Sequence, residues 1–550
     1  MAVKEFSVLQ KVLICSMVTT VVWINFICFI DTKQWFKQDR FPSQKATYKF
    51  DQQRNMSKEG DKSDERRTVP VQALKRIDEY MNFTDLKDHL SLVNISTSLV
   101  TIRKKTSVVR VGDNVMIDII LFNGRGERTK NGGDMLRVWL REPDLNASVS
   151  GYVIDHGNGS YTGVVKAMWP GNPELMFSVA NTKEHIGIFL NVVRRYGLSK
   201  FLQAFFKKGN LTESTLCSIL PNIPNTAALC NFTNQNFNFS FFCGKPKELG
   251  CEDWKEYSRS AINSCNEKQK SLFMNYKYFK KRVGKLHISA GTTGEPNISC
   301  HDVSSALTWQ TTNPTGYFFN NEWRSLLCKP SLSWRYKSYA SCLKNRPVLL
   351  TGDSTTRNWY SPLAKLLKLH VFVGRHEVKD EAWQKFAEAV DKNNLLSIYW
   401  TPHEIPFFSY KQNKNNFRTV ASRIDDLPGN QRAIIILHWF GHMTMTTPNH
   451  FREHVASAKH AVQRLLRRSP HSSILIKGPH SFTHKYYFLE PFDYLNRIYK
   501  QILYEEFIDL QEKVYFIDQW DATVGNENVD IHPKPFLNPI MANFAFSFIC

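Results

Sequence analysis

The chain has 550 residues, a length that accommodates two to four folded domains. Apolar residues make up 42% of the sequence and charged residues 22%, which excludes a chain that is disordered throughout. The 71 lysine and arginine residues exceed the 50 aspartate and glutamate residues, giving a formal net charge of +21. Such an excess favours an anionic partner: a nucleic acid, a membrane surface or an acidic glycan.

The first thirty residues indicate the cellular compartment, and the compartment decides which of these partners the chain can meet. Residues 12–30 carry no charge, and a helix of this length spans about one hydrocarbon thickness. No cleavage site of small residues follows them. We therefore expect residues 1–30 to be an uncleaved signal-anchor that inserts in the membrane, with a cleaved signal peptide as the alternative. The polar, charge-mixed residues 31–91 are expected to form a stem or linker.

Asn-x-Ser/Thr sequons support this topology. All nine precede residue 300, which predicts a glycosylated N-terminal half. We expect a protein of the secretory pathway, either a single-pass type II Golgi membrane protein or a secreted one, with no nucleic acid as a partner. The sequon asparagines are Asn55, Asn82, Asn94, Asn146, Asn158, Asn210, Asn231, Asn238 and Asn297.

The cysteines agree with an oxidising compartment. Nine of the 11 lie outside residues 12–30, and they concentrate in the middle of the chain. This clustering predicts a disulfide framework. The odd number leaves one thiol unpaired or paired with another chain. No CxxC pair or Cys/His tetrad at ligand spacing occurs, so we expect no metal and no bound cofactor.

The middle of the chain has two parts that differ in hydrophobic pattern and composition. From about residue 97, apolar and polar residues alternate between Gly-rich turns, which predicts β-strands. We expect an immunoglobulin-like β-sandwich over residues 92–200. Residues 201–345 are rich in cysteine and aromatic residues, and their regular structure cannot be assigned from the sequence.

From residue 346 short apolar runs alternate with helical patterns. The run PVLLTGD reads as a buried strand, and the apolar spacing of the residues that follow it is helical. Further strands and helices alternate to the end of the chain. This order predicts parallel βαβ units and a three-layer α/β domain over residues 346–550.

One motif in this domain carries chemistry. Gly352, Asp353 and Ser354 follow its first strand and open a helix. There the serine is expected at the carboxyl edge of the sheet, with helix amides and the helix dipole where an oxyanion would develop. His532 follows the last predicted strand and is a candidate base. The alternative is that the motif only caps the helix. The strand before it and the late Asp-x-His favour a catalytic serine.

The motif extends into a family resemblance. Early serine and late histidine are the chain order of SGNH (GDSL-type) hydrolases, and GDSTTRNW at residues 352–359 resembles the GDSxxRN signature of PC-esterases. The sandwich resembles a filamin-type repeat and, with the cysteine-rich stretch, neurexophilin. The chain thus resembles the neurexophilin and PC-esterase domain family over residues 70–550. The resemblance implies Ser354 as nucleophile, His532 as general base, and Arg357 and Asn358 as support for the serine loop.

The third member of a triad is less clear. The related pattern has Asp-x-x-His, whereas Asp530 here precedes His532 by two residues. In an extended segment these side chains point to the same side, so we expect Asp530 to be the acid, with Asp521 and then Asp518 as competitors. Gly374 is a candidate oxyanion donor. The choice among His438, Trp439, Gly441 and His442 for a second oxyanion role stays open.

Three functions follow from these expectations. The leading one is a lumenal glycan O-acyltransferase that passes acetyl through Ser354, with acetyl-CoA as the candidate donor and sialoglycans as the acidic acceptor. The second uses water as the acceptor and is a glycan O-acetyl esterase. The third is an adhesion ligand that binds a neurexin-like receptor and carries an inactive esterase domain.

Overall fold

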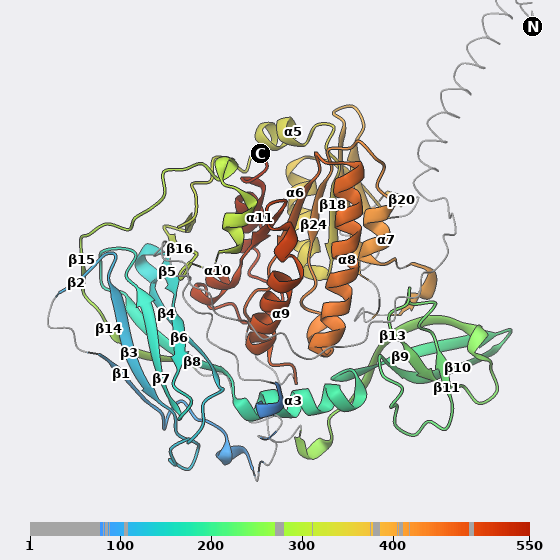
Figure 1. The fold of residues 1–550 in the computed structure, drawn as a ribbon, viewed down its shortest axis with the longest axis horizontal. Coiled ribbons are helices and arrows are strands. Elements are labelled where there is room, and N and C mark those ends of the chain that lie inside the picture. The colour runs from blue at the N-terminus through green and yellow to red at the C-terminus, as the bar shows by residue number, and fades with distance from the viewer. Residues whose placement is uncertain are drawn as a thin grey trace, which may run out of the picture.

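The computed structural model describes the chain from residue 77 to residue 550 (Figure 1). The residues that it leaves out within this range are 81, 83–85, 87, 104–107, 270–279, 311, 374–375, 378–385, 404, 406–410, 417 and 483–488. The expected membrane segment at residues 1–30, most of the stem, Asn55 and Gly374 therefore lie outside the described residues. None of the described helices is both long and apolar enough to cross a bilayer.

Two antiparallel sheets pack face to face to form a β-sandwich, at the left of Figure 1. Ile117 and Val138, from opposite sheets, lie in its buried core. One sheet has the order β1 (Leu99–Ile102), β3 (Asn114–Ile120), β7 (Ser160–Lys166), β6 (Tyr152–Asp155). The other has the order β14 (Lys280–Lys285), β8 (Glu174–Asn181), β4 (Met135–Glu142), β5 (Ala147–Ser150), β16 (Gly316–Phe319), β17 (Glu322–Ser325). A small parallel pair, β2 (Val109–Arg110) and β15 (Ile288–Ser289), lies beside them.

The sandwich uses more of the chain than residues 92–200. Strands β14, β16 and β17 come from the expected cysteine-rich stretch, and residues 183–196 form a helix instead of strands. The alternation of buried and exposed residues in β3 has the expected period of two. β16 and β17 lack such a signal because most of their side chains are buried or half-buried.

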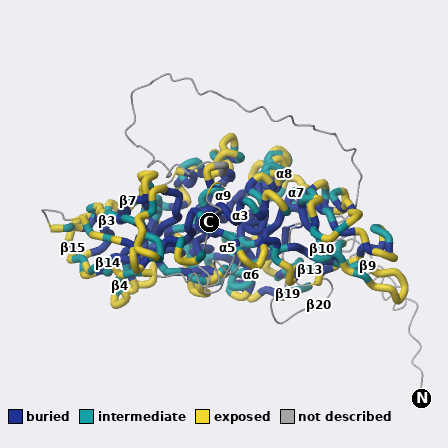
Figure 2. The backbone as a smooth tube through the Cα atoms, turned by 90° about the horizontal axis from the view of Figure 1, so that it is seen from below, coloured by how far each residue is buried: buried dark blue, intermediate teal, exposed yellow. Residues whose placement is uncertain are grey.

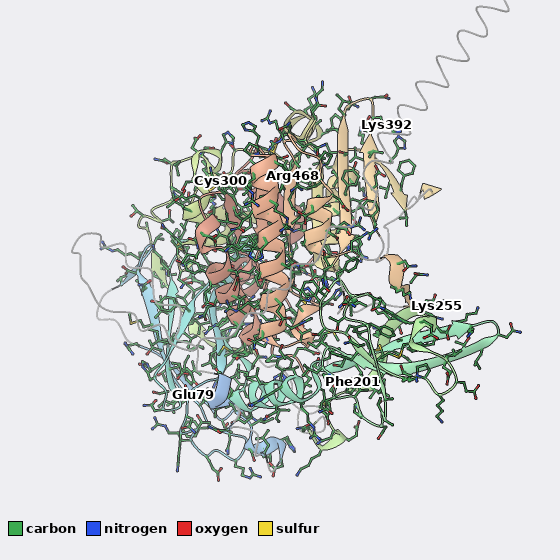
Figure 3. All side chains as sticks on the ribbon, turned by 45° about the vertical axis from the view of Figure 1, so that its right-hand side comes forward. Glu79, Phe201, Lys255, Cys300, Lys392 and Arg468 are labelled. Carbon is green, nitrogen blue, oxygen red and sulfur yellow. A yellow bond between two sulfur atoms is a disulfide. The ribbon has the colours of Figure 1, made fainter. Side chains whose placement is uncertain are left out.

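Helix α3 (Lys183–Tyr196) leads from the sandwich to a second β-sheet region, the arm, at the right of Figure 1. Thr182 caps its start, and Gly197, at φ 82°, ends it. The sheet of the arm has the order β11 (Leu229–Asn231), β12 (Phe242–Gly244), β10 (Leu211–Ser218), β9 (Lys200–Lys208), β13 (Trp254–Asn263), β23 (Gln412–Asn413). Phe201 and Lys255 mark β9 and β13 in Figure 3.

Four disulfides join eight of the nine expected cysteines. The pairs Cys217–Cys243 and Cys230–Cys251 close the arm, Cys300–Cys328 lies beside the sandwich, and Cys342–Cys550 closes the C-terminal region. The ninth, Cys265, is buried and belongs to none of these four bonds. The expected disulfide framework is therefore present, and it suggests the secretory pathway.

The C-terminal region is built on one mixed, mostly parallel sheet. β18 lies near its centre. The strands β22, β18, β24, β25 and β26 run parallel to one another, whereas β20, β19 and β21 pair antiparallel. The sheet has the order β20 (His376–Glu377), β19 (His370–Val373), β21 (Ala387–Asp391), β22 (Leu396–Pro402), β18 (Val348–Gly352), β24 (Ile434–Leu437), β25 (Ser473–Lys477), β26 (Val514–Ile517). Continuous apolar runs in the central strands are typical of strands buried on both faces.

Helices cover both faces of this sheet, and Figure 2 shows the buried interior in dark blue. Ile435 of β24 packs with helices on one face, and its neighbour Ile434 packs with helices on the other. The first face carries α7 (Val420–Asp425), α8 (Pro448–Arg468) and α9 (Phe492–Glu506). The second carries α5 (Tyr336–Leu343), α6 (Ser354–Leu366) and α11 (Leu537–Phe546). Two short helices, α2 (Ile77–Tyr80) and α10 (Trp520–Gly525), lie beside the sandwich.

Buried polar contacts join the sandwich to the C-terminal region. Arg137 of β4 forms an ion pair with Asp493 of α9, and its guanidinium also donates to the carbonyl oxygen of Phe482 at 3.2 Å. The two paired side chains are 2% and 3% exposed, so the pair is shielded from solvent. Asp521 of α10 accepts hydrogen bonds from Ser150 and Thr315 of the sandwich. The two regions therefore share a solvent-excluded joint.

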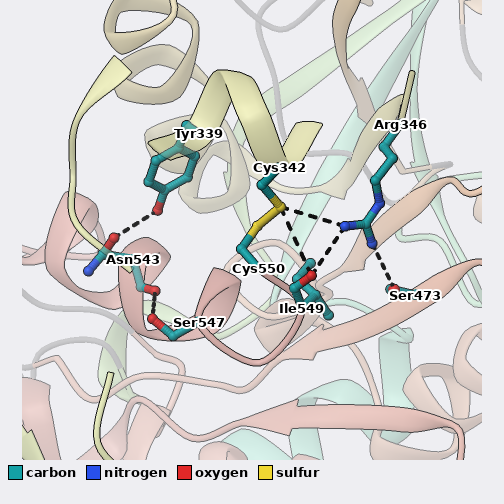
Figure 4. The surroundings of a disulfide bond; sticks show 8 residues. All are labelled: Tyr339, Cys342, Arg346, Ser473, Asn543, Ser547, Ile549 and Cys550. Atoms are coloured by element: carbon teal, nitrogen blue, oxygen red, sulfur yellow. Dashed lines mark hydrogen bonds between the residues drawn. A yellow bond between two sulfur atoms is a disulfide. The ribbon is translucent and has the colours of Figure 1, made fainter. Parts of the chain in front are cut away.

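The disulfide Cys342–Cys550 ties the end of the chain to α5 (Figure 4). Next to it, Arg346 donates to the carbonyl oxygen of Ile549 at 3.1 Å and to Ser473 at 3.2 Å. The last residues are thus held against the first strand of the sheet by a covalent bond and by a cation.

Candidate active site

Ser354 lies where the central strand of the parallel sheet becomes a helix. β18 ends at Gly352, Asp353 is the N-cap, and Ser354 is the first residue of α6. A Cβ atom on Gly352 would lie 2.2 Å from the carbonyl oxygen of His438, so only glycine allows this close approach of the two strand ends. The serine therefore lies at the carboxyl edge of the sheet, where α/β proteins commonly bind ligands.

The structure brings Ser354 and His532 together. The serine Oγ and the imidazole Nε2 are 2.7 Å apart, although 178 residues separate them in sequence. Ser354 is half-buried and His532 reaches solvent, so the pair is accessible. For the hydroxyl to donate, the imidazole must be neutral with its proton on Nδ1.

Desolvation by the surrounding protein lowers the pKa of His532, and the charges of Asp353 and Asp530 only partly oppose it. The ring is therefore neutral at pH 7 and able to accept a proton. A neutral imidazole within hydrogen-bond reach of a serine hydroxyl is the arrangement that general-base activation requires.

Two side chains fix the loop that carries His532. His480 donates from Nε2 to the carbonyl oxygen of Ile531 at 2.7 Å. The Asn528 amide donates to the carbonyl oxygens of Asp530 and Ser481 at 2.8 and 3.0 Å. Both supporting side chains are fully buried, so the loop is hydrogen-bonded to the protein interior. The imidazole position is thus set by the protein framework.

The three candidate acids lie in different surroundings. The carboxylate of Asp530 accepts from the main-chain N–H of His532 at 3.5 Å, and none of the described residues forms a hydrogen bond with the imidazole Nδ1. Asp521 accepts hydrogen bonds from Ser150 and Thr315 of the sandwich. Asp518 forms an ion pair with Lys500 at 2.5 Å. Of the three, only Asp530 contacts His532, through the backbone.

A buried carboxylate behind the serine organises the site. Asp353 accepts from the Thr355 N–H at 2.8 Å, from the Thr355 hydroxyl at 2.6 Å and from the Gly441 N–H at 2.5 Å. Burial would raise the pKa of Asp353, but electrostatic interactions with His438, His442 and Lys477 and the hydrogen bond from Thr355 hold it well below its usual value. The ionised carboxylate links the first turn of α6 to the segment after β24.

Lys477 lies under the same turn. Its ammonium donates to the Thr355 hydroxyl at 3.1 Å and is 3.4 Å from Nε2 of His438. Burial lowers the pKa of Lys477 to about 8, against the attraction of Asp353. Burial also lowers the pKa of His438 to about 3, so that imidazole is neutral and donates from Nδ1 to the Lys477 carbonyl oxygen at 2.7 Å. Lys477 is therefore the cation that balances Asp353.

The candidate oxyanion groups can be placed in part. The main-chain N–H of Ser354 donates to no described residue and points from the start of a helix. Gly441 gives its N–H to Asp353, and His442 lies 3.1 Å from His403, nitrogen to nitrogen. Trp439 and His438 are buried. The Ser354 N–H thus has no partner among the described residues, whereas the Gly441 N–H is engaged, and Gly374 lies outside the described residues.

The two supporting residues lie on the first turn of α6, as the motif predicts. The guanidinium of Arg357 is buried over the ring of Trp400, 5.6 Å from its centroid. Its charge also contributes to lowering the pKa of His532, after the larger effect of desolvation. Asn358 is half-buried.

Sequence reasoning did not identify Asp353, Lys477 or His480 as parts of the site. Asp353 stands inside the motif but was considered only as part of a cap. Lys477 ends the apolar strand β25, and a lysine in a strand that is buried throughout is a signal that could have been used. His480 has no comparable signal, because its role depends on a loop 51 residues away.

Comparison with known families agrees with this two-part architecture. Residues 81–263 match the neurexophilin family model, and residues 323–550 match the model described as NXPE family member 4-like, C-terminal domain. The first match covers much of the β-rich region and the second covers the α/β region that carries Ser354 and His532. The protein therefore belongs to the NXPE family, as a neurexophilin domain followed by an NXPE4-like C-terminal domain.

Proposed function

We propose that the C-terminal region is an SGNH-hydrolase-like domain of the PC-esterase type that transfers an acetyl group to a glycan hydroxyl in the lumen of the secretory pathway. The observation that carries the proposal is the 2.7 Å contact between the Ser354 Oγ and the His532 Nε2 at the carboxyl edge of a parallel sheet. A neutral, accessible imidazole at that distance can activate the hydroxyl.

Two half-reactions follow from this geometry. In the first, the Ser354 Oγ attacks the carbonyl carbon of an acetyl donor while His532 takes the hydroxyl proton. The leaving group then departs with that proton, and acetyl-Ser354 remains. In the second, the acceptor hydroxyl gives its proton to His532 and attacks the acetyl carbon. The Ser354 oxygen leaves and recovers the proton. The Ser354 amide, at the positive end of α6, supports the oxyanion in both steps.

Acetyl-CoA is the donor and a sialoglycan the acceptor in this proposal. The net charge of +21 and the lumenal setting favour an acidic glycan as the partner. Transfer to water would make the same machinery a glycan O-acetyl esterase, since the acetyl-serine intermediate is common to both reactions.

The test is released-glycan mass spectrometry on cells that lack the protein and are given the wild type, Ser354→Ala or Ser361→Ala. Ser361 is a matched control because it lies on the same helix, about two turns after Ser354. We expect the wild type and Ser361→Ala to raise O-acetylated sialic acid, and Ser354→Ala to lose at least roughly 10³-fold of the activity while its secretion or Golgi retention is unchanged.

Two results would contradict this function. A fall in O-acetylation with the wild type but not with Ser354→Ala would make the protein an esterase. Equal amounts of O-acetylated sialic acid with the wild type and with Ser354→Ala would mean that Ser354 transfers no acetyl group. The adhesion-ligand function would then be favoured.

A further inference from the structure

A cavity of about 770 Å³ lies between the β16–β17 hairpin of the sandwich and helix α11 of the C-terminal region. It is separate from the serine site, because none of its lining residues contacts Ser354 or His532. Its walls combine aromatic rings with charged and amide groups, and they include Trp323, Trp334, Glu322, Lys329 and Asn543. A mixed lining of this kind suits a ligand that is both apolar and rich in hydrogen-bonding groups.

Trp323 is a rigid part of this wall. It is 8% exposed, and its indole nitrogen has almost no accessible surface, so that nitrogen does not face the cavity. The ring packs on Phe318, with centroids 5.2 Å apart, and a Cβ atom on Gly316 would lie 2.4 Å from it. The indole is thus locked in place.

The rim of the cavity carries a sequon. Asn297 is exposed, is part of the lining and begins the tripeptide Asn-Ile-Ser. The next residues are pinned to the cavity wall: Ser299 pairs with Lys329 in a β-bridge, and the Lys329 N–H donates to the carbonyl oxygen of Ile298 at 2.8 Å. The disulfide from Cys300 to Cys328 fixes the same two segments, near the position that Figure 3 labels Cys300. Asn297 is therefore held at the cavity mouth.

We propose that this cavity is a carbohydrate site and that its occupant is the N-glycan carried by Asn297 itself. The first sugars of that glycan enter the cavity and lie against Trp323 and Trp334. The tether gives the sugar a local concentration in the millimolar range or above, so weak contacts are enough to seat it. The glycan then fills a gap between the neurexophilin domain and the C-terminal region.

Protection of this glycan is the first test. Native and denatured protein from mammalian cells is treated with an amidase that cleaves N-glycans from asparagine, and release is followed site by site by peptide mapping. Asn210 is the matched control, since it is exposed at the β9–β10 turn. We expect release from Asn297 to be about tenfold slower than from Asn210 in the native protein and equal to it after denaturation. An unmodified Asn297, or equal rates in the native protein, would overturn the proposal.

A double-mutant cycle is the second test. Asn297→Gln should lower the melting temperature by at least roughly 2 °C, whereas Asn210→Gln should leave it unchanged. Trp334→Ala should restore fast release of the Asn297 glycan and should cost less stability in the Asn297→Gln background than in the wild type. Additive effects of the two substitutions would overturn the intramolecular contact. Equally, binding of a free glycan by the wild type with its Asn297 glycan in place would assign the cavity to an external ligand.

Discussion

Replacing Lys477 with methionine should remove one pH dependence of the free energy of unfolding. Lys477 is buried, and its pKa falls from 10.5 to about 8 because burial disfavours the charged form. A group whose pKa is lower in the folded state destabilises that state at low pH, where it must be charged. This cost disappears as pH rises from about 8 to the unfolded value of 10.5, so the contribution of Lys477 to stability rises with pH.

The size of the effect follows from the shift. Each unit of pKa difference corresponds to about 1.4 kcal/mol, so the full cost is roughly 3 kcal/mol. Between pH 7.5 and pH 10, roughly 2 kcal/mol of it should be relieved in the wild type and none in Lys477→Met. Tyrosines and other groups that titrate in this range are present in both proteins, so they cancel in the difference between the two unfolding free energies.

Urea unfolding at several pH values between 7.5 and 10, without reductant, measures this difference. Lys208→Met, at an exposed position of the arm hairpin, is the control and should track the wild type. If Lys477→Met shows the same pH dependence as the wild type, the ammonium is not held in a desolvated site, and its assignment as the cation that balances Asp353 is wrong.

Two further predictions concern the base and the chain end. The rate of 4-nitrophenyl acetate hydrolysis should fall as the pH is lowered, with a midpoint below pH 6.5, because desolvation by the surrounding protein lowers the pKa of His532. Asp530→Asn should shift that midpoint to still lower pH and cost about tenfold at most, since the carboxylate contacts the backbone; a loss near 10⁴ would instead place it on the ring in the reacting state. Cys550→Ser should lower the unfolding free energy by about 5 kcal/mol, more than Cys217→Ser, because the bond to Cys342 closes the longer loop. Urea midpoints under non-reducing conditions give the ranking, and equal losses would refute it.

Regular periodicity made the C-terminal region predictable. The apolar run of β24 and the apolar spacing of α8 each fit one type of element, so both elements form where they were expected. The expected alternation fails over residues 370–402, where β19, β20, β21 and β22 follow one another with no described helix between them. The pairing of Ser354 with His532 was accessible through the motif and the late Asp-x-His. It was not accessible through strand order, because two strands separate β18 from β26 in the sheet. Helix α3 was missed because its start follows directly on β8, within a stretch assigned to strands.

What could not be predicted depends on contacts between distant segments. β16 joins the sandwich through a pairing of Phe318 with Ser148, 170 residues earlier, and no local pattern encodes such a partner. The surroundings of Asp521 could not be predicted for the same reason. Its acid group looked available beside the last strand, but the sandwich supplies the hydroxyl of Ser150 that engages it. Long-range pairing, and not local propensity, determines both outcomes.

The crossing of the chain at the β16–β17 hairpin limits how this protein can be divided. The C-terminal family match begins at residue 323, inside β17, while that strand completes a sheet of the preceding domain. A fragment that starts at the match would carry half a hairpin and would expose the carboxylates of Asp493 and Asp521 without their partners. A fragment that ends before it would lack β17, the edge strand of its own sandwich. The boundary between the two family matches is therefore not a boundary between folding units, and we expect the two regions to fold as one unit.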